Sequence, residues 1–134
     1  MKNFGTNALQ HLCGLLKEEL NNSGGVKESD YTSDIVINTS NVKNLWSTSI
    51  KKSGSIVNFV INITVNDISS FTAELGTLPA EVTPNGSVSM NTVANRGDGC
   101  YVYIDSNGKF GITKFYNNGW DDGDGVRLVV SYLV

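Results

Sequence analysis

The feature that most constrains this chain is the alternation of side chains in residues 55–65, Ser-Ile-Val-Asn-Phe-Val-Ile-Asn-Ile-Thr-Val. Every second residue is apolar, namely Val57, Phe59, Ile61, Ile63 and Val65. The residues between them are mostly polar, and a period of two rich in β-branched residues favours a strand with one buried face. Burial of such side chains contributes about 1.5–3 kcal/mol each, so this strand alone can anchor a hydrophobic core.

The composition limits the class of protein. With 134 residues, the chain has the length of a single domain, and its 40% of hydrophobic residues is too high for a disordered chain. The net charge of −3 argues against binding to a nucleic-acid backbone, which favours a basic surface. No apolar run approaches the ~20 residues of a membrane-spanning helix, so we expect no membrane insertion. The first residues contain no apolar stretch of the secretory type, which predicts a chain made in the cytoplasm without a signal peptide.

Residues 6–20 have the pattern of an amphipathic α-helix. The apolar stripe with spacings of three and four residues consists of Leu9, Leu12, Cys13, Leu16 and Leu20. A helix this short is marginal alone in water, so it must pack on its own domain or in a bundle with copies of itself. Gly24 and Gly25 end the pattern with a flexible joint. We therefore divide the chain into an N-terminal helix and joint (1–25), for oligomerisation or attachment, and a β-rich head (26–134).

Two further patterns in the head predict strands that are apolar on both faces. Asn107-Gly108 is the preferred dipeptide of a two-residue type I′ hairpin turn, and that register pairs Tyr103 with Ile112 on the face opposite to Val102. In residues 126–134, even-numbered positions are apolar on one face, while Val129 and Leu133 make the other face apolar as well. Strands that are apolar on both faces are buried on both faces. A single small sandwich cannot supply both covers, so the pattern predicts a symmetric oligomer.

Several segments, in this order, carry a family resemblance. Leu75-Gly76-Thr77-Leu78-Pro79 is followed by a second proline at Pro84, then by a hairpin segment at 101–110 and an apolar strand at 128–134. Arranged this way, residues 45–134 resemble the C-terminal head domain of phage and prophage tail fibre and receptor-binding (baseplate) proteins. The resemblance implies an all-β fold, an antiparallel, jelly-roll-like β-sandwich that forms a homotrimer. It also implies a virion protein that contacts other tail proteins and binds a host cell-surface saccharide or protein without catalysis.

The most unusual polar stretch lies between the last two expected strands. We take it as the candidate glycan-binding site, with these residues: Tyr116, Asn117, Asn118, Trp120, Asp121, Asp122 and Asp124. In this interpretation the Trp120 indole is a flat face for a sugar ring, and the amides and carboxylates are partners for hydroxyl groups. Two other interpretations remain open: a Ca²⁺ site made by the three aspartates, although the glutamate of an EF-hand loop is missing, and a polar connection without a ligand.

Catalytic patterns are weak. The one histidine, His11, lies beside the leucine stripe. No serine or cysteine stands in a known nucleophile motif that this histidine could serve as a base. Asp98 and Asp105 can be imagined as the carboxylate pair of a glycosidase, but polar turns explain them better. We therefore predict a protein that is not an enzyme and holds no cofactor or metal. The alternatives are a purely structural tail component and a hydrolase that acts on polysaccharide.

Overall fold

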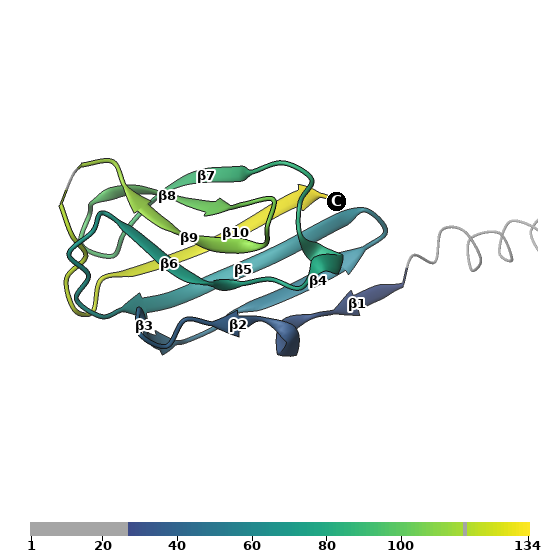
Figure 1. Ribbon diagram of the computed structural model, residues 1–134, viewed down its shortest axis with the longest axis horizontal. Helices are drawn as coiled ribbons and strands as arrows, with labels where there is room; N and C mark the ends of the chain where they lie inside the picture. The colour runs from purple at the N-terminus through teal and green to yellow at the C-terminus, as the bar shows by residue number, and fades with distance from the viewer. Residues whose placement is uncertain (1–26, 117) are drawn as a thin grey trace, which may run out of the picture.

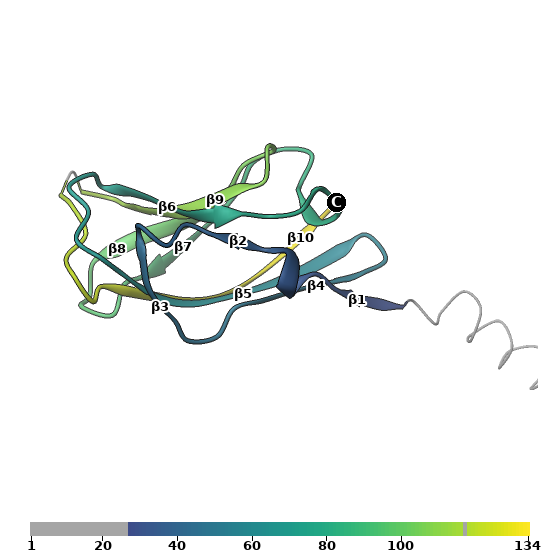
Figure 2. The same cartoon turned by 60° about the horizontal axis from the view of Figure 1, so that its bottom comes forward.

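Two antiparallel sheets pack face to face in the computed structural model, which describes residues 27–116 and 118–134 (Figures 1 and 2). Sheet A has the order β1-β4-β5-β10, with β3 also paired to β5, and sheet B has the order β2-β6-β9-β8-β7. The strands of sheet A are β1 (Glu28–Asp30), β3 (Val42–Leu45), β4 (Ser49–Ser53), β5 (Ile56–Val65) and β10 (Gly125–Leu133). Those of sheet B are β2 (Val36–Ile37), β6 (Thr72–Thr77), β7 (Val88–Val93), β8 (Gly99–Ile104) and β9 (Lys109–Lys114). Two short 3-10 turns, Thr32–Asp34 and Ala80–Val82, complete the described structure, so the all-β prediction is confirmed.

The long alternating strand is confirmed as the centre of sheet A. Its odd-numbered side chains from Val57 to Val65 are all buried, and Phe59 meets Phe110 of sheet B edge to face, with ring centroids 5.1 Å apart. β10 pairs with β5 along nine residues, which places its even-numbered side chains on the same inner face. The core therefore lies between the two sheets, as the alternation of β5 predicted.

The connection between β4 and β5 is a tight turn. β4 continues through Lys51 and Lys52 to Ser53, and β5 begins at Ile56. The chain reverses at Gly54, whose φ of 61° lies in the left-handed region that glycine enters without strain.

The register expected for the hairpin of β8 and β9 is wrong by one residue. Tyr103 pairs with Gly111, and Val102 pairs with Ile112. Gly108 has a φ of 88°, and no non-glycine residue in the described parts has a positive φ, so the turn is not type I′. The Gly108 N–H donates to Asp105 O, which fits a three-residue loop ending in a glycine bulge. Because a one-residue shift moves side chains to the other face, Ile112 belongs to the core.

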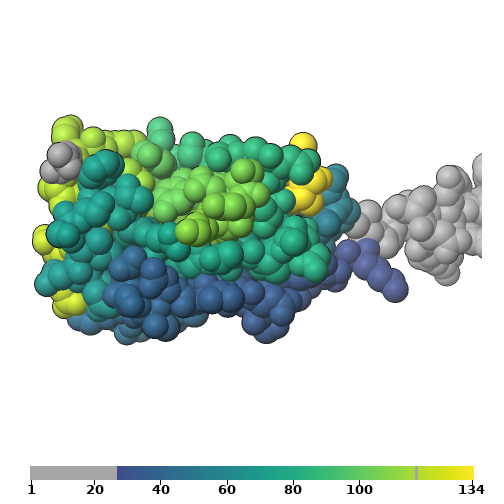
Figure 3. All heavy atoms as spheres, viewed as in Figure 1, coloured from purple at the N-terminus to yellow at the C-terminus, as the bar shows by residue number. Residues whose placement is uncertain are grey.

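On the outer face of sheet B, two aromatic rings pack on glycines of the same sheet. The Tyr103 ring lies over Gly111, and the Phe115 ring lies over Gly99. Burial against this surface, with smaller effects of nearby carboxylates, raises the pKa of Tyr103 to about 12. Figure 3 shows β8 and β9 filling the centre of this face. Of the apolar second face that we predicted for the hairpin, Tyr103 lies on this outer surface, whereas Ile112 and Phe110 are buried in the core.

The outer face of sheet A is different. Val129 and Leu133 of β10 are 61% and 69% exposed, and Ile56 opposite Leu133 is 48% exposed. The last strand thus has apolar side chains on both faces, as predicted. Within the described residues, however, only its inner face is buried.

The N-terminal elements fall outside this description. The helix expected at 6–20 and the glycine joint at 21–25 lie outside the described residues, so the division at residue 25 stays a prediction. Within residues 27–116 and 118–134, no helix has the length and apolar character needed to cross a membrane.

Candidate functional site at the loop end

The candidate loop between β9 and β10 is organised by the buried ammonium group of Lys114. This side chain, at the end of β9, is only 2% exposed. Its Nζ donates to the carbonyl oxygen of Gly119 (2.8 Å) and pairs with the carboxylates of Asp98 (3.1 Å) and Asp124 (3.3 Å). It also lies 4.9 Å from the centre of the Trp120 ring, in the geometry of a cation–π contact. One ammonium thus ties the β9–β10 loop to the end of β9 and to the loop before β8.

The electrostatics of Lys114 follow from its partners. Burial favours the neutral amine, but hydrogen bonds and charges of Asp98 and Asp124 outweigh that effect and raise the pKa of Lys114 above its ordinary value. The side chain is therefore a stably charged structural cation, which argues against a role as a base at neutral pH.

Further contacts fix the remaining part of the loop. The Arg96 guanidinium lies 3.2 Å from Asp124 and donates to the carbonyl oxygen of Asp122 (3.0 Å). Lys43 of β3 pairs with the Asp122 carboxylate at 2.6 Å. The Asp122 N–H donates to Asp67 at 2.7 Å. Figure 1 shows the loops before β6, β8 and β10 gathered at one end of the sandwich, and we call this end the loop end.

Trp120 is not the exposed sugar platform that the sequence suggested. It is 1% exposed, because its backbone forms a bridge with Ile68 and its indole N–H donates to the carbonyl oxygen of Phe71 (2.8 Å). Asp124 is also 1% exposed and is paired with Lys114 and Arg96. Neither side chain is accessible to a ligand, since both belong to the framework that holds the loop.

The other candidates lie at the surface. Tyr116 is 74% exposed, Asn118 is exposed, and the side chains of Asp121 and Asp122 are 78% and 53% exposed. Asn117 lies outside the described residues. A hollow of about 520 Å³ runs beside the loop, with this lining: Asp67, Ile68, Ser69, Gly119, Trp120 and Asp121. The structure therefore brings exposed carboxylates and hydroxyls of two segments together.

The carboxylates of this loop already have cationic partners. Asp122 pairs with Lys43, Asp124 with Lys114, and Asp121 lies 3.8 Å from Arg96. In the described parts of the chain, no group of three His, Cys, Asp or Glu side chains converges as a metal site. This donor set does not favour the Ca²⁺ interpretation, because a cation at this place would compete with three basic side chains.

The carboxylate pair imagined for a glycosidase does not come together. Asp98 and Asp105 flank β8, whose six residues lie between them. At about 3.3 Å per strand residue, the two carboxylates are roughly 20 Å apart, well beyond the separations of about 5–10 Å that such pairs need. Asp98 serves the Lys114 network instead.

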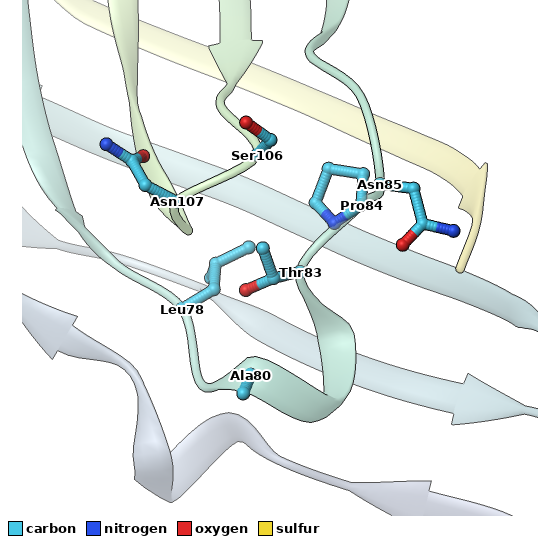
Figure 4. A pocket seen from close by; sticks show the side chains of 7 residues that line it. All are labelled: Leu78, Ala80, Thr83, Pro84, Asn85, Ser106 and Asn107. Carbon is cyan, nitrogen blue, oxygen red and sulfur yellow. The ribbon is translucent and has the colours of Figure 1, made fainter.

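A second hollow, of about 560 Å³, lies at another turn of the head (Figure 4). Its walls come from the segment between β6 and β7 and from the β8–β9 turn, with this lining: Leu78, Ala80, Thr83, Pro84, Asn85, Ser106 and Asn107. These side chains are neutral, and the Thr83 hydroxyl is already used as a donor to Pro79 O (2.9 Å). The hollow contains no aromatic or charged side chain, so it is the weaker of the two candidates for specific recognition.

Comparisons with known proteins add no identity to this geometry. No family model matches the chain, and no curated protein matches it either.

Sequence reasoning missed the residues that hold the loop. Lys114 was not singled out, because a lysine at an expected strand end gives no sign that it will be buried. The one available signal was the net excess of acidic residues around 121–124, which requires cationic partners from elsewhere in the chain. Asp67 and Ser69, on the far side of the hollow, carried no such signal.

Proposed function

We propose that this chain forms the head of a phage or prophage tail protein that binds a host-surface saccharide and carries out no chemistry on it. The ordered resemblance of residues 45–134 to head domains of that family supports the proposal. The all-β architecture of two facing sheets is compatible with it. In this proposal the protein resides in the virion, contacts other tail proteins and uses no cofactor.

The observation that carries the proposal is a polar loop whose conformation is fixed by the cationic side chains beneath it. The buried Lys114 ammonium and Arg96 donate to the carbonyl oxygens of Gly119 and Asp122, and Lys43 pairs with the Asp122 carboxylate. Exposed side chains remain on the outer side of the loop. A binding loop that is already ordered loses little conformational entropy when a ligand binds. Tyr116 offers an aromatic face, while Asn118 and Asp121 offer partners for sugar hydroxyls.

The test is a glycan array probed with the full chain, followed by calorimetry with any saccharide that binds. Tyr116→Ala and Asp121→Asn should each weaken binding about tenfold, which corresponds to the loss of one good contact. Asn85→Ala, at the hollow of Figure 4, is the matched surface control and should leave the affinity unchanged. The absence of binding to any cell-wall saccharide contradicts the proposal. Release of reducing ends from host polysaccharide would instead favour the hydrolase alternative.

A structural role in the tail is the second candidate, and the outer face of sheet A favours it. Ile56, Val129 and Leu133 form an exposed apolar stripe, and exposed apolar patches mark contact surfaces. In this proposal copies of the head, three in the homotrimer that we predict, share the stripe. Light scattering should give the mass of an oligomer for the full chain, and Val129→Glu with Leu133→Glu should lower that mass. A monomer at micromolar concentration argues against this role.

A further inference from the structure

A β-bulge on sheet A exposes the second tryptophan of the chain. β3 and β4 both pair with β5, and the residues between them interrupt one continuous antiparallel run. The N–H groups of Trp46 and Ser47 both donate to the carbonyl oxygen of Asn62, at 2.9 and 3.2 Å. Two residues thus oppose one, which is the definition of a bulge, and bulges commonly redirect a side chain. The bulge accounts for a large aromatic residue at the surface of an otherwise regular sheet.

The exposure of Trp46 sets it apart. It is 65% exposed, whereas Trp120 is 1% exposed. Tyr103 and Phe115 on the other sheet lie over glycines, which gives those rings a partner within the chain. A tryptophan that leaves most of its surface in water forgoes a large gain from burial, so the Trp46 indole is available for a ligand.

Two polar side chains complete a row across the sheet. Arg127 of β10 is the partner of Asn62 of β5, and Asn62 lies opposite the bulge, so the order across the strands is Trp46, Asn62, Arg127. Neighbouring strands are about 4.8 Å apart, so the three side chains fall within the width of one or two sugar rings. Within residues 27–116 and 118–134, no carboxylate lies within ion-pair distance of Arg127, and the Asn62 amide side chain makes no hydrogen bond.

Hollows lie on both sides of this row. One, of about 280 Å³, has Trp46, Thr64 and Gly125 in its lining, and the other, of about 410 Å³, has Ser47, Val60 and Val129. Both are also lined by Asn62 and Arg127. Gly125, the partner of Thr64, lines the first hollow with its backbone, and a Cβ there would lie 2.7 Å from the carbonyl oxygen of Ile63. Asn62 and Arg127 therefore border both hollows, and a ligand in the first hollow can contact all three residues of the row.

We propose that Trp46, Asn62 and Arg127 bind a saccharide that carries an acidic group. The indole stacks on the C–H face of a sugar ring, the Asn62 amide pairs with a hydroxyl, and the Arg127 guanidinium pairs with a carboxylate or phosphate, for which its fork geometry is suited. The inference rests on the proposed function of saccharide recognition and adds a site distinct from the 116–124 loop. An apolar surface of a second copy is a poorer occupant of this row, because that contact would bury the Arg127 charge without a partner.

The experiment is an array of uronic-acid, phosphate-bearing and neutral oligosaccharides, probed with the full chain and with single variants. Trp46→Ala should weaken binding about 30-fold, as expected for a tryptophan at the centre of a binding site. Arg127→Gln should weaken binding of the acidic saccharides about tenfold and leave any neutral binding unchanged. The uronic-acid and phosphate arms identify which acidic group is recognised. Lys109→Gln, an exposed cation on sheet B, is the charge-matched control and should have no effect.

Acrylamide quenching of tryptophan fluorescence distinguishes a ligand contact of Trp46 from a purely structural role, because only a ligand contact changes the quenching when saccharide is added. Trp120 is buried, so quenching of the native protein should come from Trp46 and should vanish in Trp46→Phe. A saccharide bound on the indole should protect it from quencher.

The outcomes separate this inference from the proposed function. Binding that is lost with Tyr116→Ala but kept with Trp46→Ala overturns the inference and leaves saccharide recognition standing. An Arg127→Gln variant that retains the preference for acidic saccharides overturns the role of the guanidinium. A Trp46→Ala variant with altered mass in light scattering assigns the row to a protein interface and overturns the site. Silence across the whole array removes both proposals.

Discussion

Replacement of Lys114 by methionine should destabilise the protein more than any other single change of a charged side chain described above. Methionine keeps much of the aliphatic stem but removes the ammonium, and with it the contacts to Gly119 O, Asp98 and Asp124. The Asp124 side chain is 2% exposed, so its charge stays buried after the change. Loss of one partner of a buried ion pair costs about 3–5 kcal/mol. Because Arg96 still lies 3.2 Å from Asp124, we expect the lower end, about 3 kcal/mol.

Urea denaturation at pH 7 measures this loss. With a slope of about 1–3 kcal/mol per molar urea, the midpoint should fall by about 1–3 M. The double variant Lys114→Met with Asp124→Asn removes both charges and should recover part of the loss, since an amide oxygen still accepts from the Asp121 N–H. Lys109→Met is the matched control, because the exposed Lys109–Glu74 pair should contribute under about 1 kcal/mol.

The same variant tests the pH dependence. The pKa of Lys114 is raised in the folded state, so the stabilisation by its charge is complete below its ordinary pKa of 10.5 and disappears as the pH rises through the higher folded value. The native protein should therefore lose stability above that pH more steeply than Lys114→Met does. A loss under 1 kcal/mol at pH 7, or parallel alkaline profiles, would falsify the structural role given to this ammonium.

Three further changes test the packing. Gly111→Ala places a methyl group 2.3 Å from the carbonyl oxygen of Ala73 and should lower the free energy of unfolding by about 1–3 kcal/mol, measured by urea denaturation. The control Gly86→Ala, with no atom within 4 Å of the new methyl group, should be nearly neutral. Equal effects of the two changes would contradict the close approach at Gly111. Phe59→Ala empties the centre of the core and should cost about 3–5 kcal/mol, and a midpoint within error of the native protein would refute its central position. Burial raises the pKa of Tyr132, so its neutral form stabilises the fold below pH 10, and this stabilisation is lost at higher pH. In an absorbance titration, Tyr132→Phe should have one fewer phenol that ionises late. An unchanged titration would exclude that assignment.

Much of sheet A was predictable because its signals are local. The alternation in β5 specifies a strand and its buried face without reference to any partner, and β10 carries a similar pattern.

The β8–β9 hairpin was located correctly by its Asn-Gly dipeptide. Its register was not, because the choice between a two-residue and a three-residue loop depends on which strand faces pack against the other sheet. With Ile112 required in the core, only the three-residue loop satisfies both strands.

The sequence did not separate the buried side chains of the candidate loop from the exposed ones. The sequence pointed to the 116–124 loop, and the structure puts Tyr116, Asp121 and Asp122 at its surface. It assigned Trp120 and Asp124 to the same surface, because neighbours in a polar segment look alike in one dimension. The sequence did not indicate Trp46 as a site residue, because it lies in an ordinary strand pattern. Its exposure comes from the bulge opposite Asn62.

The sequence by itself determined that the described part of the chain is all-β and is built around an alternating central strand, since side-chain periodicity and β-branching act over neighbouring residues. The tertiary structure decided which charges and aromatic rings are buried. Lys114 meets Asp98 and Asp124 only when the loop end assembles, and one tryptophan is enclosed there while the other is left in water. The physical reason is that the cost of burying a charge or the gain from burying a ring depends on partners distant in sequence, which no local pattern specifies.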